Sequence, residues 1–357
     1  MARRRKNDRK RLIFWRVIIL SFIILVLSAT YTAYDLYKKV LRPNVVLTEN
    51  SDPYLYIPSH SDFDKVCRIL ADRGLVRNIN SFIWVAEKKN YTNQIKAGRY
   101  KIKKGMNNND LVNLLRSGEQ EAVRLSFQNL RTLEQLAGVV SRHIEADSLS
   151  LMHLFNDEGF TGHYGFDRRE LLAMFLPNTY EFYWNTSAEE FFKRMAREYK
   201  QFWNEDRKSK ARSLGLSQTE VTTLASIVQA EQTIRPDERP RVAGLYLNRL
   251  EKGMRLESDP TVIYAMGNYK VQRVLNEDRK VDSPYNTYMY KGLPPGPINI
   301  PEISSIDAVL NCEKHDYIFM CAKEDFSGYH YFTKTFRQHS IYARRYRKEL
   351  NKRKIYR

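Results

Sequence analysis

The residue with the clearest capacity for chemistry is Glu231, which closes the apolar stretch LASIVQAE at residues 224–231. The capping-box spacing of Ser217 and Glu220 predicts that a helix begins shortly before this stretch. On a helix with 3.6 residues per turn, the apolar residues of the stretch share one face with Glu231. Burial disfavours a charged carboxylate and raises its pKa, and an acid that stays protonated near neutral pH can protonate a leaving group.

The pattern leaves a second interpretation open, in which Glu231 is only the first exposed residue after the buried part of the helix. Further along, a helix is predicted over residues 238–250, with Asn248 and Arg249 near its C-terminal end. Asp259 then precedes Pro260, and proline is common in the first turn of a helix. Asp259 could therefore be only the cap of a short helix over residues 261–266.

The segment YNTYMYKGLPPGPI, residues 285–298, is predicted to be a stiff loop, because its prolines fix the backbone and remove N–H donors. Tyr285, Asn286, Thr287 and Tyr288 place amide, hydroxyl and aromatic groups on it. This set suits a sugar, which needs hydrogen-bond partners for its hydroxyl and acetamido groups and flat apolar surfaces for its ring faces. A rigid loop without a ligand is the alternative.

The aromatic run at residues 175–184 is expected to be loop or strand. It could stack on sugars or plug a domain interface. The sequence has no HExxH, Walker or GxGxxG motif and no zinc-like Cys/His spacing, so neither a metal nor a nucleotide cofactor is predicted. Cys312 and Cys321 could form a disulfide, or they could both be buried thiols together with Cys67.

The formal net charge of the 357 residues is +18, and most of it lies at the two ends of the chain. The middle is nearly balanced, which argues against a nucleic-acid-binding core. Residues 12–34 are mostly apolar and long enough to span a bilayer of roughly 30 Å. The basic residues 1–11 predict a cytoplasmic N-terminus. A cleaved signal peptide is the alternative, but SATYTAY offers no clear cleavage site.

Periodicity divides the remainder into further parts, which together predict an α+β fold. Residues 35–53 are expected to be a linker. Residues 54–127 carry a strand–helix–helix–strand pattern typical of small LysM-like modules, with a third helix and a closing strand, and residues 337–357 form a basic tail. The tail could contact anionic wall or membrane surfaces, or it could be a solvated helix.

Several motifs, in this order, resemble the YceG-like family of endolytic murein transglycosylases: LASIVQAE, VAGLYLNRLEKGMRLESDPTVIYAMG, SPYNTYMYKGLPPGPINIP and HYFTKTFRQH. Upstream, IKAGRYKIKKGM and FLPNTYEFYW resemble the same family's LysM-like unit and the segment after it. The resemblance covers nearly the whole chain past residue 40, except the basic tail. It implies a membrane-anchor helix, a small LysM-like βααβ subdomain at 54–127 and a mixed α/β catalytic domain at 128–336.

The resemblance also implies that Glu231 is the catalytic acid. Family members often carry a second acid two residues earlier, where this chain has Gln229, which cannot transfer a proton. The motif positions expected to line the substrate groove are Asn248, Arg249, Asp259, Thr261, Tyr264, Tyr285, Asn286, Thr287, Tyr288, Gly292, Leu293, Pro294, Pro295 and Gly296.

The implied substrate is the peptidoglycan glycan strand, cut between N-acetylmuramic acid and N-acetylglucosamine to give a 1,6-anhydro end. One carboxylate suffices for this reaction, because the nucleophile is the sugar's own 6-hydroxyl, whereas ordinary glycoside hydrolysis uses two carboxylates. No metal or cofactor is required. The family-level expectation is an enzyme at the inner membrane that cuts nascent strands near cell-wall synthases and ends glycan polymerisation.

Two alternatives remain open from the sequence. One is a muramidase that uses water, with Asp259 or Glu257 as its second carboxylate. The other is an anchored scaffold that binds glycan without cutting it. In both cases the catalytic or binding domain is expected outside the cytoplasmic membrane, with peptidoglycan and not nucleic acid as partner.

Overall fold

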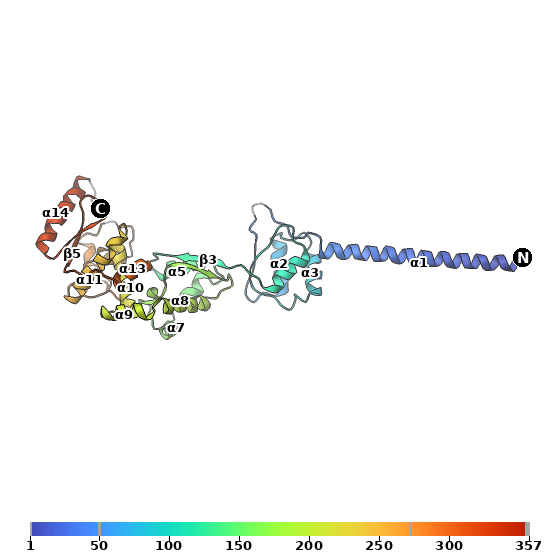
Figure 1. The fold of residues 1–357 in the computed structure, drawn as a ribbon, viewed down its shortest axis with the longest axis horizontal. Coiled ribbons are helices and arrows are strands. Elements are labelled where there is room, and N and C mark those ends of the chain that lie inside the picture. The colour runs from blue at the N-terminus through green and yellow to red at the C-terminus, as the bar shows by residue number, and fades with distance from the viewer. Residues whose placement is uncertain (1, 49–50, 272, 354–357) are drawn as a thin grey trace. The chain divides into compact units, whose positions relative to one another are not determined.

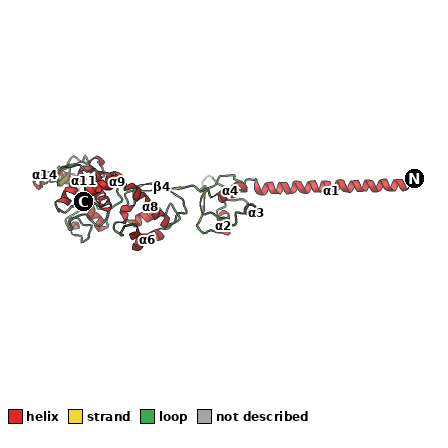
Figure 2. Ribbon diagram, turned by 60° about the horizontal axis from the view of Figure 1, so that its bottom comes forward, coloured by secondary structure: helices red, strands yellow, loops and turns green. Residues whose placement is uncertain are grey.

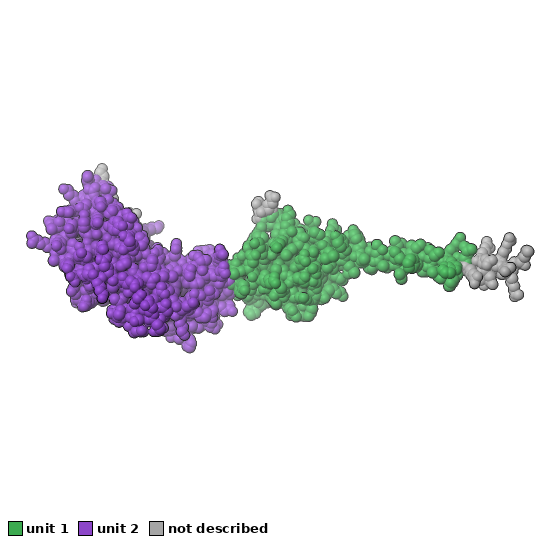
Figure 3. Space-filling model, viewed as in Figure 1, with its two compact units in different colours: residues 1–123, 183–185 green, residues 124–182, 186–357 purple. Residues whose placement is uncertain are grey.

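A computed structural model describes residues 2–48, 51–271 and 273–353 of the chain (Figure 1). The chain divides into two compact units, one of Met1–Val123 with Tyr183–Asn185 and one of Arg124–Phe182 with Thr186–Arg357 (Figure 3). Helices provide most of the regular structure in both units, and the strands are short (Figure 2). We describe each unit by itself.

The first unit holds the N-terminal helix and a small α+β body. Its elements up to the last helix of that body are α1 (Ala2–Val40), β1 (Tyr54–Ile57), α2 (Phe63–Asp72), α3 (Ile79–Lys88), β2 (Gly98–Lys101) and α4 (Asn108–Ser117).

Helix α1 contains a stretch, Leu12–Val40, that is long and apolar enough to cross a membrane. Its large apolar side chains, such as Leu20 and Phe22, are more than half exposed in the protein, and lipid is the solvent that suits such a surface. The helix continues past Tyr34, where the sequence placed its end, because an ion pair between Lys39 and Asp35 (2.7 Å) supports its last turn.

The segment expected to be a linker is partly built into the first unit, which corrects that prediction for residues 43–47. Val45 is buried and forms an isolated bridge with Val76. The side chain of Asn108, fully buried, donates to the Lys39 carbonyl (2.8 Å) and accepts from Asn44 (2.7 Å). These bonds satisfy buried amides that would otherwise be costly, so they tie the end of α1 to the small body.

The predicted strand–helix–helix–strand order is present in the small body. β1 and β2 pair antiparallel, with Leu55 opposite Tyr100 and Ile57 opposite Gly98. The alternate residues Leu55 and Ile57 are fully buried, as expected for a strand with one face on a core. Helices α2, α3 and α4 supply the rest of that core, including the buried Val66 and Phe82.

The strand expected to close the small subdomain, β3 (Val123–Phe127), pairs instead with β4 (Asn178–Phe182). The buried residues alternate along β3, and the Phe127 ring stacks on Tyr180 at 5.7 Å between centroids. The aromatic run that the sequence left as loop or strand therefore contains a strand, and its buried rings plug a core. Periodicity identified β3 as a strand but could not identify its partner.

The second unit is mainly helical. Its remaining elements are α5 (Leu133–Val140), α6 (Ser148–Asn156), α7 (Glu158–His163), η1 (Leu171–Met174), α8 (Ala188–Phe202), α9 (Glu205–Ser213), α10 (Gln218–Glu231), η2 (Pro236–Glu238), α11 (Arg239–Glu251), α12 (Asp259–Met266), η3 (Asp278–Lys280), α13 (Ile303–Leu310), β5 (Phe319–Ala322), β6 (His330–Thr333) and α14 (Phe336–Lys352).

Helix α10 lies at the centre of this unit. The predicted capping box is present, since Ser217 and Glu220 bond each other's backbone N–H groups. Nine residues of α10 are buried, on more faces than the single stripe that the sequence indicated. Helices α11 and α13 both pack against it. A helix surrounded in this way has a fixed axis, so its last residue has a fixed place.

The basic tail begins as helix α14, which packs on the β5–β6 hairpin. The ring of Tyr342 stacks on Tyr331 at 4.1 Å between centroids. Arg344 and Lys348 are exposed on the helix. The tail is thus a helix with one face on protein and one face of basic residues in solvent as far as Arg353, the last described residue.

Gly296, in the proline-rich loop, has no room for a side chain. A Cβ there would lie 2.0 Å from the Arg169 carbonyl oxygen. We predict that Gly296→Ala lowers the free energy of unfolding by roughly 1–3 kcal/mol, because backbone on both sides must shift. Chemical denaturation of the detergent-solubilised chain measures this.

The matched control is Gly138→Ala in α5, where a Cβ would meet no atom within 4 Å. This variant should gain roughly 0.5–1 kcal/mol, because alanine loses less backbone entropy than glycine in a helix. Equal effects of the two substitutions would contradict the steric argument.

Candidate active site

Glu231 is the last residue of α10, and its carboxyl group meets two other helices. Its Oε1 accepts hydrogen bonds from the Tyr246 hydroxyl of α11 (2.9 Å) and from the Ser258 hydroxyl (2.5 Å), which directly precedes α12. Among the described residues, no group donates to Oε2. The side chain is partly exposed although protein surrounds most of its carboxyl group. One oxygen of the carboxyl group is thus held by two hydroxyl donors of the protein.

Burial raises the pKa of Glu231 above its ordinary value, and this is the largest influence on it. The hydrogen bonds from Ser258 and Tyr246 act in the opposite direction, because they favour the anion. The charge of Asp259 raises the pKa further by repulsion. The prediction of a raised pKa at the end of an apolar helix is confirmed, and the carboxyl group is not merely a solvated end.

Ser258 is fully buried and is held by the threonines of two segments. Its N–H donates to Thr287 Oγ1 (3.0 Å), and its carbonyl accepts from Thr261 Oγ1 (2.7 Å). The two threonine hydroxyls also bond each other at 2.8 Å. Thr261 and Thr287 were expected to line the groove; both are buried, and their hydroxyls hold the main chain of Ser258.

Asp259 is not the cap of its helix, which corrects that interpretation. Ser258 occupies the cap position, and Asp259 is the first residue of α12. Asp259 Oδ1 accepts from the Tyr288 hydroxyl (2.6 Å) and pairs with Arg279 (3.3 Å). Desolvation and the neighbouring carboxylate hold the pKa of the Tyr288 hydroxyl far above its usual value, so the hydroxyl stays a donor. The Asp259 carboxylate lies close enough to Glu231 to raise the pKa of Glu231.

Further expected groove residues are buried, and two of them, Asn286 and Arg249, are hydrogen-bonded within the protein. Asn286 donates to the Arg279 and Val281 carbonyls (2.9 and 2.7 Å), which fixes the turn before Tyr288. Arg249 donates to three main-chain carbonyls and pairs with Glu257 at 3.0 Å. Pro294 is also buried.

Asn248 is half-buried and belongs to the same class of structural contact. Its amide donates to the His315 carbonyl (2.6 Å) and the Tyr317 carbonyl (3.0 Å), so it anchors the chain before β5. The other expected groove residues that keep partial exposure are Asp259, Tyr264, Tyr285, Tyr288, Gly292, Leu293 and Pro295. The rings of Tyr264 and Tyr285 lie 4.7 Å apart, so they form one aromatic surface.

Sequence reasoning missed the two residues that contact Glu231 most directly. Tyr246 was assigned only to the apolar stripe of its helix, and Ser258 was passed over beside Asp259. A signal existed for Tyr246, since a tyrosine on a buried stripe needs a partner for its hydroxyl. For Ser258 the signal is weak, because a serine before a helix that begins Asp-Pro usually serves as a cap.

Gln229 has a structural role in this protein. Its Oε1 accepts from the Glu302 N–H (2.6 Å) and the Ser305 hydroxyl (3.0 Å), on the side of α10 that faces α13. The three cysteines are free thiols, so Cys312 and Cys321 are not paired. Within the described ranges, no group of three or more His, Cys, Asp or Glu side chains is placed to hold a metal.

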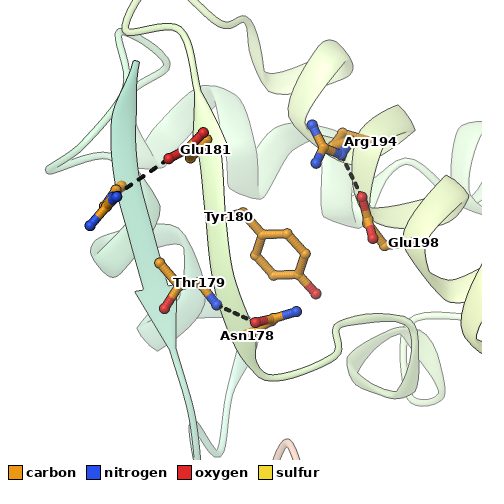
Figure 4. Close-up of a pocket in the computed structure, with 7 residues that line it drawn as sticks. Asn178, Thr179, Tyr180, Glu181, Arg194 and Glu198 are labelled. Atoms are coloured by element: carbon orange, nitrogen blue, oxygen red, sulfur yellow. Dashed lines mark hydrogen bonds and ion pairs between the residues drawn. The ribbon is translucent and has the colours of Figure 1, made fainter. Parts of the chain in front are cut away.

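A polar hollow of about 420 Å³ lies elsewhere in the same unit, between β3, β4 and α8 (Figure 4). Its lining includes ion pairs between Arg194 and Glu198 and between Arg124 and Glu181. No residue of α10, α11 or α12 lines it. The Arg124–Glu181 pair is largely exposed, whereas the Arg194–Glu198 pair is partly buried. Size alone does not make the hollow the reactive site, and the perturbed carboxyl group is the better guide.

The sequence and the fold are both similar to those of known proteins. The model of the YceG-like family matches residues 55–345, so the chain belongs to the YceG-like family. A Bacillus subtilis (strain 168) protein named endolytic murein transglycosylase is 30% identical over 327 residues, which cover 87% of this chain and 89% of that protein.

Two further relatives extend the comparison. A Streptococcus pneumoniae serotype 2 (strain D39) protein with the same name is 27% identical over 344 residues, which cover 86% of this chain but 61% of that longer protein. A crystal structure of a YceG-like protein from Listeria monocytogenes superposes with a TM-score of 0.55 and is 28% identical, covering 82% of this chain and 99% of that one.

The raised pKa of Glu231 predicts how stability depends on pH. Its contribution to folding is complete below the unfolded-state pKa of about 4.3 and is lost as the pH rises through the higher folded-state value. Glu231→Gln keeps a neutral group at every pH, so it should be at least as stable as the wild type near pH 8 without the same advantage near pH 4. Urea denaturation at both pH values measures this, and a variant destabilised only at alkaline pH would contradict it.

Proposed function

We propose that this protein is a membrane-anchored endolytic lytic transglycosylase that cleaves the β-1,4 bond between N-acetylmuramic acid and N-acetylglucosamine in peptidoglycan strands. The observation that carries the proposal is the Glu231 carboxyl group, which has a raised pKa and one oxygen held by the hydroxyls of Tyr246 and Ser258. Relatives named endolytic murein transglycosylase align with most of the chain. The chain would therefore act as a carbon–oxygen lyase on a cell-wall polymer.

In the proposed reaction, Glu231 donates its proton from Oε2 to the bridging oxygen as the bond from that oxygen to C1 of the muramic acid breaks. Electron pair and proton leave together with the N-acetylglucosamine hydroxyl. The 6-hydroxyl of the muramic acid then attacks C1, and its proton passes to the Glu231 carboxylate, which restores the acid. The products carry a 1,6-anhydro end, and no water is consumed.

The neighbours of Glu231 suit both halves of this cycle. Burial keeps the proton on the carboxyl group in the resting enzyme. Tyr246 and Ser258 then stabilise the carboxylate at the moment when it has lost that proton. Glu231 must act first as an acid and then as a base. Burial raises its pKa and the two hydrogen bonds lower it, and this balance suits a residue that performs both steps.

Asp259 and Glu257 are the two carboxylates that a water-using muramidase could use, and Glu257 is paired with Arg249. Asp259 Oδ1 is engaged by both Tyr288 and Arg279, which favours a fixed negative charge near the reacting sugar over a base that activates water. We infer that it stabilises positive charge at C1 during bond cleavage. The partly exposed Tyr264, Tyr285 and Pro295 would contact sugar faces, while the buried residues beneath them hold the loop.

We infer the location from α1. Basic residues before the apolar stretch predict a cytoplasmic N-terminus at the inner membrane, with the small α+β body of the first unit and the whole second unit outside. The βααβ part of the first unit would act as a LysM-like module that holds glycan. An enzyme anchored this close to the membrane meets strands as they are made, so it would work beside cell-wall synthases and end glycan polymerisation.

The decisive test is digestion of uncrosslinked glycan strands by the full chain in detergent, with product masses measured. Reducing ends should lack the mass of one water. Glu231→Gln should lose activity by at least roughly a hundredfold, because an amide cannot donate the proton, while its thermal unfolding stays cooperative. Products that carry the full water mass would indicate a muramidase, and a folded wild type without any cutting would favour the scaffold.

The hydroxyl of Tyr246 makes a prediction about pH. It lowers the pKa of Glu231, so Tyr246→Phe should raise that pKa, and the loss of kcat/KM at alkaline pH should move upward by roughly one unit. Tyr290→Phe is the control, because it also removes a tyrosine hydroxyl that bonds a carboxylate, but that carboxylate is Asp282 (2.6 Å). A shift toward lower pH, or equal shifts in both variants, would contradict the assignment.

A further inference from the structure

A second buried carboxylate lies just beyond the end of α10. Glu238 in η2 is buried, with 3% of its side chain exposed. Its Oε1 accepts from the His330 N–H (3.0 Å), and its Oε2 lies 2.7 Å from His330 Nδ1 and 2.5 Å from the Gln232 amide nitrogen. Both oxygens therefore have polar partners. Burial raises the pKa of Glu238, but the hydrogen bonds and charge of His330 and the hydrogen bond from Gln232 outweigh it, so the pKa lies below its ordinary value. The reaction proposed above does not use this group.

The partner Gln232 directly follows Glu231 and is held at every polar atom that its side chain offers. Its amide nitrogen also donates to the Gly328 carbonyl (3.0 Å), and its Oε1 accepts from the Arg235 N–H (2.9 Å). Its main-chain carbonyl accepts from Arg239 Nε (3.0 Å). A residue fixed through both side chain and backbone fixes its neighbour as well, since one peptide unit separates them.

We propose that Glu238, held between Gln232 and His330, is a positioning residue that fixes the carboxyl end of α10 and keeps the Glu231 carboxyl group against Tyr246 and Ser258. The inference rests on the proposed function, in which Glu231 is the acid. We call the contacts of Glu238 with Gln232 and His330 the clamp. Without it the last turn of α10 would tend to fray, because the last carbonyls of a helix lack partners within the helix. Glu231 would then still be an acid, but its carboxyl group would no longer be held in position.

The clamp also joins α10 to the β5–β6 hairpin. His330 begins β6, and Gly328 lies in the turn before it. A Cβ on Gly328 would lie 2.8 Å from Ile234, in the segment that follows Glu231. The hairpin and the end of α10 therefore contact each other through both main chain and side chain. A displacement of the hairpin would change the position of Glu231.

Glu238→Gln tests the proposal, because an amide must direct its own N–H groups at one of the donors around it. In the full chain, kcat should fall by roughly ten- to a hundredfold while KM changes by less than about threefold, since misplaced acid weakens only the chemical step. Asp307→Asn is the control: it removes a half-buried carboxylate, paired with Arg207 between α13 and α9, that makes no hydrogen bond to residues 229–238.

A reciprocal exchange provides the rescue. Gln232→Glu alone should also lower kcat, because it sets two carboxylates face to face. Gln232→Glu combined with Glu238→Gln restores one donor opposite one acceptor between these two side chains, while the Gly328 carbonyl loses its donor in both variants, so the rescue is partial. The double variant should recover at least about fivefold in kcat over either single variant, which additive damage cannot produce.

Hydrogen exchange gives a readout that does not depend on activity. Amides of residues 229–235 should exchange faster in Glu238→Gln than in the wild type or Asp307→Asn. Unchanged exchange, an unchanged kcat, or a loss confined to KM would overturn the proposal. A wild type that makes no anhydro product, with faster exchange in Glu238→Gln, would instead overturn the proposed function and leave the clamp intact.

Discussion

The structure depends on one constraint, which is that a carboxyl group must be kept largely out of water without being paired to a cation. Glu231 receives two neutral hydroxyl donors, from Tyr246 and Ser258, and both act on the same oxygen. A nearby lysine or arginine would have made the group a permanent anion, and full exposure would have given it an ordinary pKa. Two neutral donors in a protected setting suit the proposed role, in which the group first loses and then regains a proton.

Much of the second unit can be understood as the means of meeting that constraint. The acid comes from α10, the first donor from α11 and the second from the residue before α12. Buried threonine hydroxyls at positions 261 and 287 fix the second donor, and they tie it to the loop that carries Tyr285 and Tyr288. Rigid positions matter because proton transfer requires that donor and acceptor come within hydrogen-bond reach.

The charges around the site are arranged in pairs, which keeps them from neutralising the acid. Arg249 is engaged by Glu257 and by main-chain carbonyls, Arg279 by Asp259, and Arg239 by Glu302. Each of these three guanidinium groups is therefore paired with a carboxylate other than that of Glu231. Helix α1 meets a different demand: its apolar surface, exposed in the protein, suits a bilayer, which would restrict the enzyme to strands near the membrane.

The sequence by itself determined the apolar N-terminal helix, the helix that ends at Glu231 and the prolines that stiffen the loop, because these follow from local spacing and residue type. It left open whether the Glu231 carboxyl group is buried. Only the tertiary structure decided that β3 pairs with β4, that Asp259 engages Tyr288 and Arg279, and that Asn286, Thr287 and Arg249 lie beneath the surface. It also supplied Tyr246, Ser258 and His330 as neighbours of the acid. Such contacts join residues distant in the chain, and the pairing of side chains across that distance is set by how helices pack, which local pattern does not encode.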